Sequence, residues 1–146
     1  VLFRSVPLGF RIARMPGLRM AMEYVLPRSL VEASVRNVYG QPERVTPELV
    51  DRYFELTLRA GNRKALAQRM DQRLWGDEDS IKTIRQPTLI LWGAQDHLIP
   101  LENAKKFEAD IAGSLLVVLE GLGHVPQEED AQTSVQVLRT FLASHP

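Results

Sequence analysis

The sequence has 146 residues, of which 45% are hydrophobic and 25% are charged. This is the composition of an ordinary globular domain with one core, so it excludes disordered and fibrous proteins. The 18 basic residues balance 18 acidic residues, so no net field favours nucleic acid or an anionic membrane, and we expect a small-molecule partner.

The residue types that are missing exclude several kinds of chemistry. There is no cysteine, which removes disulfides, thiolate catalysis and cysteine-based zinc sites. Only three histidines occur, among them His97 and His145, and no converging set of ligands accompanies them, so we expect neither a metal nor a cofactor. No apolar run approaches the roughly 20 residues that span a bilayer. These features leave the compartment open, with the cytoplasm favoured.

The first five residues do not fit a native start. The sequence begins without an initiator Met or the apolar region of a signal peptide. Its opening VLFRS resembles the translated end of a common sequencing adapter. We therefore expect residues 1–5 to be non-native and the chain to be a fragment of a longer gene product.

Residues 6–83 show helical patterns and no convincing strand. Before Ser29 three prolines break any long helix, although residues 18–26 have the composition of a short one; these are Pro7, Pro16 and Pro27. Ser29 with Glu32 three residues later matches a capping box, and apolar residues at helical spacing follow until Gly40. The sequence therefore predicts a helix from Ser29 to about Gly40.

Two further helices are predicted in this half. Thr46 followed by Pro47 is typical of a helix start, and a broad apolar face continues until Gly61. Asn62 can cap a third helix, whose narrow apolar stripe predicts a surface position. That stripe consists of Leu66, Met70 and Leu74.

Residues 84–146 alternate between strand and helix. The runs 88–92 (TLILW) and 115–119 (LLVVL) are fully apolar, as in strands that are buried on both faces of a parallel sheet. A crossover helix over 101–111 separates them, and apolar residues over 135–142 mark a final helix. This is a β-α-β-α unit, whose strands lie parallel and adjacent.

Two strands alone cannot form a sheet that is buried on both faces. The apolar runs therefore require neighbouring strands that this chain does not contain. We expect these from a missing amino-terminal core of the same protein or from another chain.

Asp96 follows the first strand and His124 follows the second. In such a sheet, ligands bind at the carboxyl ends of the strands, so the two side chains are expected to meet there. A carboxylate that holds one imidazole nitrogen as a donor leaves the other free to accept a proton from a nucleophile. The sequence thus favours Asp96 as the acid and His124 as the base of a catalytic triad.

Simpler interpretations exist for each residue. Asp96 can cap a turn or the following helix, and His124 can be an ordinary loop histidine. Glu128, Glu129 and Asp130 are expected to give the last helix a negative first turn, which its dipole favours. Apolar residues of the first half are more often core than substrate pocket; they include Phe10, Met15, Met20, Met22 and Tyr24.

Residues 87–100 (PTLILWGAQDHLIP) and 123–128 (GHVPQE) together resemble the last two core strands of α/β-hydrolase family members. Their acid precedes their base, in the order nucleophile, acid, base of that family. The resemblance implies a partial α/β-hydrolase fold of class α/β, in which residues 1–83 form a helical cap and residues 84–146 the carboxyl-terminal part of the core.

The resemblance also implies a hydrolase that acts on a small apolar ester or related substrate. No serine here lies in the Gly-x-Ser-x-Gly setting of the family's nucleophile, so we expect this chain alone to be inactive. Alternatives are haloalkane, epoxide or carbon–carbon bond hydrolysis within the same fold, or a non-catalytic ligand-binding member. The sequence does not identify the natural substrate or the oligomeric state.

Overall fold

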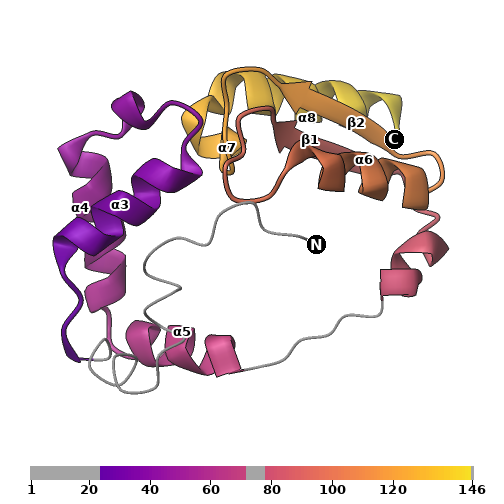
Figure 1. Cartoon of the computed structure of the whole chain (residues 1–146). Helices are drawn as coiled ribbons and strands as arrows, with labels where there is room; N and C mark the ends of the chain where they lie inside the picture. Colours follow the sequence, from indigo (N-terminus) through magenta and orange to yellow (C-terminus); the bar gives the residue numbers. More distant parts are fainter. Residues whose placement is uncertain (1–23, 72–77, 146) are drawn as a thin grey trace. The chain divides into compact units, whose positions relative to one another are not determined.

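A computed structural model describes residues 24–71 and 78–145 of the chain (Figure 1). These residues form two compact units, one of residues 24–37 and 42–71, the other of residues 38–41 and 78–145. Residues 1–5, most of the predicted helix over 18–26, and Leu74 lie outside the described residues. No helix within the described ranges has the length and apolarity needed to cross a membrane.

The first unit is helical, as the sequence predicts. It contains α3 (Arg28–Val38), the 3-10 turn η1 (Pro42–Arg44), α4 (Pro47–Leu58) and α5 (Asn62–Asp71). The last residue of α3, Val38, belongs to the second unit. The Arg28 guanidinium donates to the Asp51 carboxylate at 2.6 Å and to the Pro47 carbonyl at 3.1 Å, which joins α3 to α4. The buried side chains of this unit are valines: Val31, Val35, Val45 and Val50.

The predicted capping box at the start of α3 is wrong. The Pro27 carbonyl accepts the Leu30 N–H at 3.0 Å, so the helix begins at Arg28 and Ser29 lies inside its first turn. Glu32 does not reach back to the helix start as a cap. Instead it pairs with arginines one turn away on either side, Arg28 at 3.5 Å and Arg36 at 3.1 Å.

The start of α4 follows the sequence prediction. The Thr46 hydroxyl accepts the Leu49 N–H at 3.2 Å, and Pro47 occupies the first helical position. Asn62 does not cap α5 as predicted: it is the first residue of that helix, and its side-chain amide donates to the Leu56 carbonyl at 2.7 Å, which satisfies the end of α4. The exposure of Leu66 on α5 agrees with the predicted surface position of that helix.

The second unit contains the predicted β-α-β-α arrangement. Strands β1 (Leu89–Gly93) and β2 (Leu115–Leu119) pair in parallel along their whole length, first residue opposite first. Helix α6 (Leu101–Asp110) connects them, and a 3-10 turn, η2 (Glu78–Thr83), precedes them. Figure 1 shows the strands between α6 and α8 (Ala131–Ser144). The carboxyl ends of both strands therefore meet at one edge.

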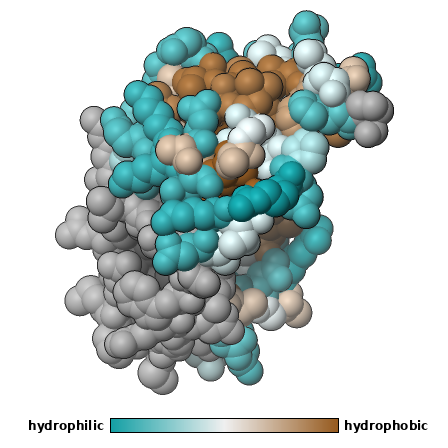
Figure 2. All heavy atoms as spheres, turned by 90° about the vertical axis from the view of Figure 1, so that its right-hand side faces the viewer, coloured by the Kyte–Doolittle hydropathy of each residue, from teal (hydrophilic) through white to brown (hydrophobic). Residues whose placement is uncertain are grey.

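The strands are less buried than their apolar sequence predicts. In β2 only Leu119 is buried, and Leu115 is 48% exposed. Apolar side chains of α8 are exposed as well, and Figure 2 shows hydrophobic surface gathered in the upper part of the view. The reason is the number of strands: two strands and two helices cannot cover both faces of this layer.

The predicted acidic first turn of the last helix is also wrong. Glu128 and Glu129 belong to a separate short helix, α7 (Pro126–Glu129), which the sequence analysis missed. Helix α8 begins after it and has no acidic residue in its first turn. Asp130 is its N-cap, and the Asp130 carboxylate accepts the Thr133 N–H at 3.0 Å.

Replacing the N-cap of α4 should destabilise the protein. Thr46→Ala leaves the Leu49 N–H without its side-chain acceptor, and the expected loss is about 1 kcal/mol in the free energy of unfolding. Denaturant unfolding measures it. Thr140→Ala is the matched control, because that hydroxyl bonds a carbonyl within α8 and caps nothing. Equal losses in the two variants would contradict the capping role.

Candidate active site

Asp96 lies in the turn that leaves β1, where its backbone N–H donates to the Gly93 carbonyl at 3.2 Å. The Asp96 side chain is only 4% exposed. Its Oδ1 accepts the backbone N–H groups of Leu98 and Ile99, both at 2.8 Å. The simpler interpretation of Asp96 as a turn cap is therefore correct for one of its two oxygens.

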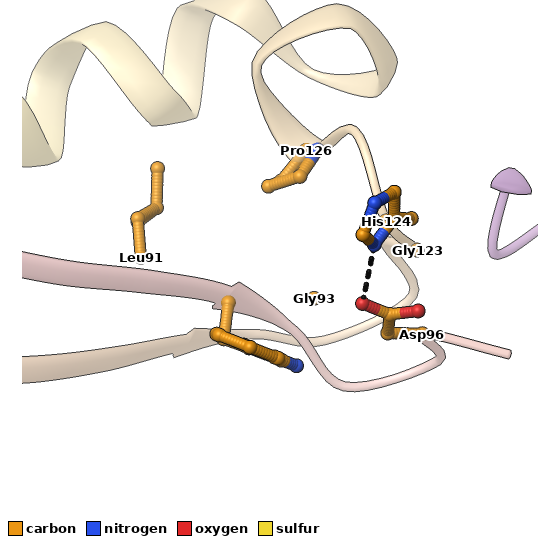
Figure 3. A pocket seen from close by; sticks show the side chains of 7 residues that line it. Leu91, Gly93, Asp96, Gly123, His124 and Pro126 are labelled. Carbon is orange, nitrogen blue, oxygen red and sulfur yellow. Dashed lines mark hydrogen bonds and ion pairs between the residues drawn. The ribbon is translucent and has the colours of Figure 1, made fainter. Parts of the chain in front are cut away.

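The second oxygen faces His124. Asp96 Oδ2 lies 2.8 Å from His124 Nδ1 (Figure 3). A carboxylate accepts hydrogen bonds, so Nδ1 carries the proton and Nε2 of the neutral imidazole is a proton acceptor. The His124 side chain remains 32% exposed, and no described residue hydrogen-bonds its Nε2. The structure thus brings together the two residues that the sequence singled out.

The pair shifts both of its own pKa values. The hydrogen bond to Asp96 raises the pKa of His124; burial opposes this, and the negative charges of Asp96 and Glu129 add to it. Burial works to raise the pKa of Asp96, but the hydrogen bonds from His124 and from the Ile99 and Leu98 backbones prevail and hold that pKa below its usual value. Asp96 is therefore ionised at neutral pH and stabilises an imidazolium at His124.

The loops that carry the two residues are joined backbone to backbone. The Ala94 N–H donates to the Leu119 carbonyl and the Gln95 N–H to the Leu122 carbonyl, both at 2.9 Å. A Cβ on Gly93 would overlap the Gly123 carbonyl and lie 2.6 Å from the Leu122 carbonyl carbon. Only glycine permits this approach, which sets Asp96 and His124 at hydrogen-bonding distance.

The glycines of the His124 loop serve two different purposes. Gly121 has a φ of 76°, a left-handed conformation that glycine adopts without strain. Gly123 instead makes room: a Cβ there would lie 2.5 Å from the Val38 carbonyl oxygen and 2.7 Å from the Tyr39 carbonyl carbon. Pro126 is buried at the first position of α7.

Two contributors to the site were missed from sequence. The Val38 carbonyl accepts the His124 N–H at 2.7 Å. The Glu129 carboxylate accepts the Gly123 N–H at 2.7 Å through one oxygen and the Gly40 N–H at 2.8 Å through the other. Gly40 is the sequence feature that could have indicated this contact, but its position after an apolar helical pattern indicates only the end of a helix.

A small cavity of about 100 Å³ opens beside the pair (Figure 3). It lies at the carboxyl end of β1, and three of its lining side chains are apolar. Its lining residues are Leu91, Trp92, Gly93, Asp96, Gly123, His124 and Pro126.

The other histidines lie in different settings. His97 is exposed, whereas Asp96 beside it is buried. His145 Nδ1 lies 2.9 Å from the Phe141 carbonyl, and its ring packs on the Phe141 ring at 4.4 Å between centroids. Within residues 24–71 and 78–145 no group of three or more possible metal ligands converges.

Comparison with known proteins gives this geometry a context. Residues 19–131 match the alpha/beta hydrolase fold family. A 2-hydroxy-6-oxo-2,4-heptadienoate hydrolase of Pseudomonas putida is 30% identical over 137 residues, which are 88% of this chain and 45% of that protein. The chain spans about half the length of the curated relatives it matches.

Two solved structures are similar in fold. A serine hydrolase involved in carbazole degradation matches with a TM-score of 0.76 at 23% identity, over 84% of this chain and 50% of that one. An esterase of Thermogutta terrifontis matches with a TM-score of 0.71 at 23% identity, over 96% of this chain and 52% of that one. At this level of identity the likeness shows the fold alone.

Removing the charge of Asp96 should lower the pKa of His124. Asp96→Asn keeps the size of the side chain but takes away the carboxylate that stabilises the imidazolium. An NMR titration of the His124 ring measures the effect. Asp79→Asn, on the exposed turn η2, is the control and should leave that titration unchanged. A His124 pKa that stays the same in Asp96→Asn would contradict the interaction.

Proposed function

The chain belongs to the alpha/beta hydrolase fold family, and we propose that it supplies the acid Asp96 and the base His124 of a hydrolase. The observation that carries this proposal is the hydrogen bond of 2.8 Å between the Asp96 carboxylate and His124 Nδ1 at the ends of adjacent parallel strands. The sequence contains no Gly-x-Ser-x-Gly, so the nucleophile belongs to a part of the protein outside this chain.

The proposed reaction passes through a covalent acyl-enzyme. His124 Nε2 takes the proton of the nucleophile's hydroxyl as its oxygen attacks the substrate carbonyl carbon. The resulting imidazolium, stabilised by Asp96, gives that proton to the leaving group as the carbonyl–oxygen bond of the ester breaks. His124 then deprotonates a water that attacks the acyl-enzyme, and the acid product leaves with the nucleophile restored.

The rest of the protein would also complete the sheet. The exposure of Leu115 and of the apolar face of α8 is what two strands leave when further strands normally pack beside them. We assign the covering of this surface to the remaining hydrolase core. We assign residues 24–37 and 42–71, the helical unit, to the cap, whereas residues 38–41 belong to the unit that carries the strands. Along the sequence we place the boundary between cap and core at residues 83 and 84.

The cavity beside His124 supports a substrate class. Its apolar lining by Leu91, Trp92 and Pro126 suits a small apolar group, and among the described lining residues the only ionisable side chains are the pair itself. We therefore propose a small apolar ester, which is hydrolysed without a cofactor.

Carbon–carbon bond hydrolysis is the second candidate. It is favoured by the 30% identity to a protein named as a 2-hydroxy-6-oxo-2,4-heptadienoate hydrolase. The same Asp96–His124 pair would serve this reaction, since it also needs a base and an acid in turn. Assaying the full-length protein with p-nitrophenyl esters and with 2-hydroxy-6-oxo-2,4-heptadienoate separates the two candidates.

Removing the base should abolish turnover by the full-length protein. His124→Ala is expected to lower kcat at least about a thousandfold while the protein stays folded, because no other group can take the proton of the nucleophile. Steady-state kinetics on the preferred substrate and circular dichroism measure the two effects. His97→Ala, one loop position beyond Asp96, is the matched histidine control and should keep the parent activity.

Three results would change the proposal. Activity of His124→Ala within a few-fold of the parent would remove His124 from the mechanism. A full-length protein with no nucleophile at the strand-to-helix elbow, and no activity on either substrate, would favour a ligand-binding member of the family. An Asp at that elbow would instead indicate haloalkane or epoxide substrates.

The pH profile offers a separate test of the base. Protonated His124 cannot accept a proton, so kcat/KM should rise with pH as the imidazolium loses its proton. The apparent pKa of that rise should lie above the usual histidine value of 6.5, since Asp96 raises it. An acidic limb centred below 6.5 would contradict the assignment.

A further inference from the structure

Glu129 is an acidic side chain beside the site that the proposed mechanism does not use. It lies at the end of α7, five residues after His124. Its two carboxylate oxygens accept hydrogen bonds from two different stretches of backbone, Gly123 N–H at 2.7 Å and Gly40 N–H at 2.8 Å. The two glycines are far apart in the sequence, and both belong to the same compact unit.

The Val38–Gln41 segment lies directly against the His124 loop. A Cβ on Gly40 would be 2.6 Å from the Leu122 carbonyl carbon and 2.7 Å from the Gly123 nitrogen. The Val38 carbonyl accepts the His124 N–H at 2.7 Å. The backbone of the base is therefore bonded on one side to this segment, while its ring is bonded on the other side to Asp96.

A charged acceptor that bonds two N–H groups holds their backbones together strongly. Hydrogen bonds to an ionised carboxylate are roughly twice as strong as neutral ones. Here the Glu129 carboxylate accepts both N–H groups, one from the Val38–Gln41 segment and one from the His124 loop. The carboxylate therefore resists separation of the segment from the loop. Each N–H is close to the His124 backbone: Gly123 precedes it, and Gly40 follows Val38 by two residues.

We propose that Glu129 is a positioning residue for His124, a clamp that fastens the His124 loop to the Val38–Gln41 segment and so holds the imidazole against Asp96. This inference rests on the proposed function for its effect on turnover. The clamp itself is a property of the fold and can be measured without any substrate.

Glu129 has an electrostatic effect on the base as well. Its negative charge adds to that of Asp96 in raising the pKa of His124. Among the described residues, Asp96 on the β1–α6 loop and Glu129 on α7 are the carboxylates whose charges raise the pKa of His124. Loss of the Glu129 charge should therefore lower the pKa of His124, a change that a purely structural residue would not produce.

The test is Glu129→Gln in the full-length protein. The glutamine carbonyl can accept only one of the two N–H groups, and its amide group, a donor, then faces the other. We expect kcat/KM to fall by about a hundredfold, the order of loss that a misplaced catalytic group gives, with the acidic limb of its pH profile moved to lower pH. Amide hydrogen exchange at Gly40, Gly123 and His124 should become faster.

The matched control is Glu120→Gln. Glu120 is exposed at the beginning of the same loop, and its replacement removes the same charge without touching the clamp. It should leave kcat/KM, the pH profile and the amide exchange as in the parent. If Glu129→Gln has the same kcat/KM, pH profile and amide exchange as Glu120→Gln, the inference is wrong.

Gly40→Ala tests the same contact from the opposite side. The added methyl group meets backbone that cannot yield as a side chain can, so the segment must move away from the loop. We expect the same loss of kcat/KM and the same faster exchange at His124, with Glu129 intact. Parent-like exchange in both Gly40→Ala and Glu129→Gln would show that no clamp operates.

The readouts separate this inference from the proposed function. If His124→Ala is inactive while Glu129→Gln keeps full activity and slow exchange, the clamp is wrong and the proposed function stands. If His124→Ala stays active, the proposed function is wrong, and faster amide exchange in Glu129→Gln still supports the clamp.

Discussion

The close approach of backbone at Gly93 and Gly123 is the constraint on which the site depends. A Cβ on Gly93 would overlap the Gly123 carbonyl, so the turn after β1 and the loop after β2 touch through their main chains. Parallel pairing brings the two strand ends to one edge, but it leaves their side chains a strand spacing apart. Direct contact between the loops closes this distance and allows the hydrogen bond of 2.8 Å between His124 and Asp96.

Asp96 shows how a structural role and a chemical role can share one carboxylate. Its Oδ1 is fixed by the N–H groups of Leu98 and Ile99, which leaves Oδ2 aimed at the imidazole. The same backbone bonds lower the pKa of Asp96 and keep it charged despite burial. The turn therefore orients the acid and preserves its ionisation, so that little reorganisation is needed when His124 becomes protonated.

Most of what the sequence predicted correctly was local. The two apolar strands, the crossover helix and the Thr46 cap are each specified by neighbouring residues, and the order of strands and helices then placed Asp96 and His124 at one edge. Two failures have different causes, one local and one nonlocal. Ser29 matched a capping box, but the Pro27 carbonyl is the acceptor that starts α3. Glu129 looked like a helix-dipole residue, whereas its partner Gly40 lies far away in the sequence and only the fold brings the two together.

The proposed acid and base are preformed within one compact unit, and this bears on how the work of catalysis would be divided in the proposed hydrolase. Every hydrogen bond that orients His124 comes from residues of that unit: Val38, Asp96 and, through the loop, Glu129. The pair is therefore set by local packing and needs no contact with substrate to form. In the proposed function, selection among esters, carbon–carbon bonds and other substrates would then come from the nucleophile and from the remaining walls of the pocket, because an oriented imidazole serves each of these reactions equally well.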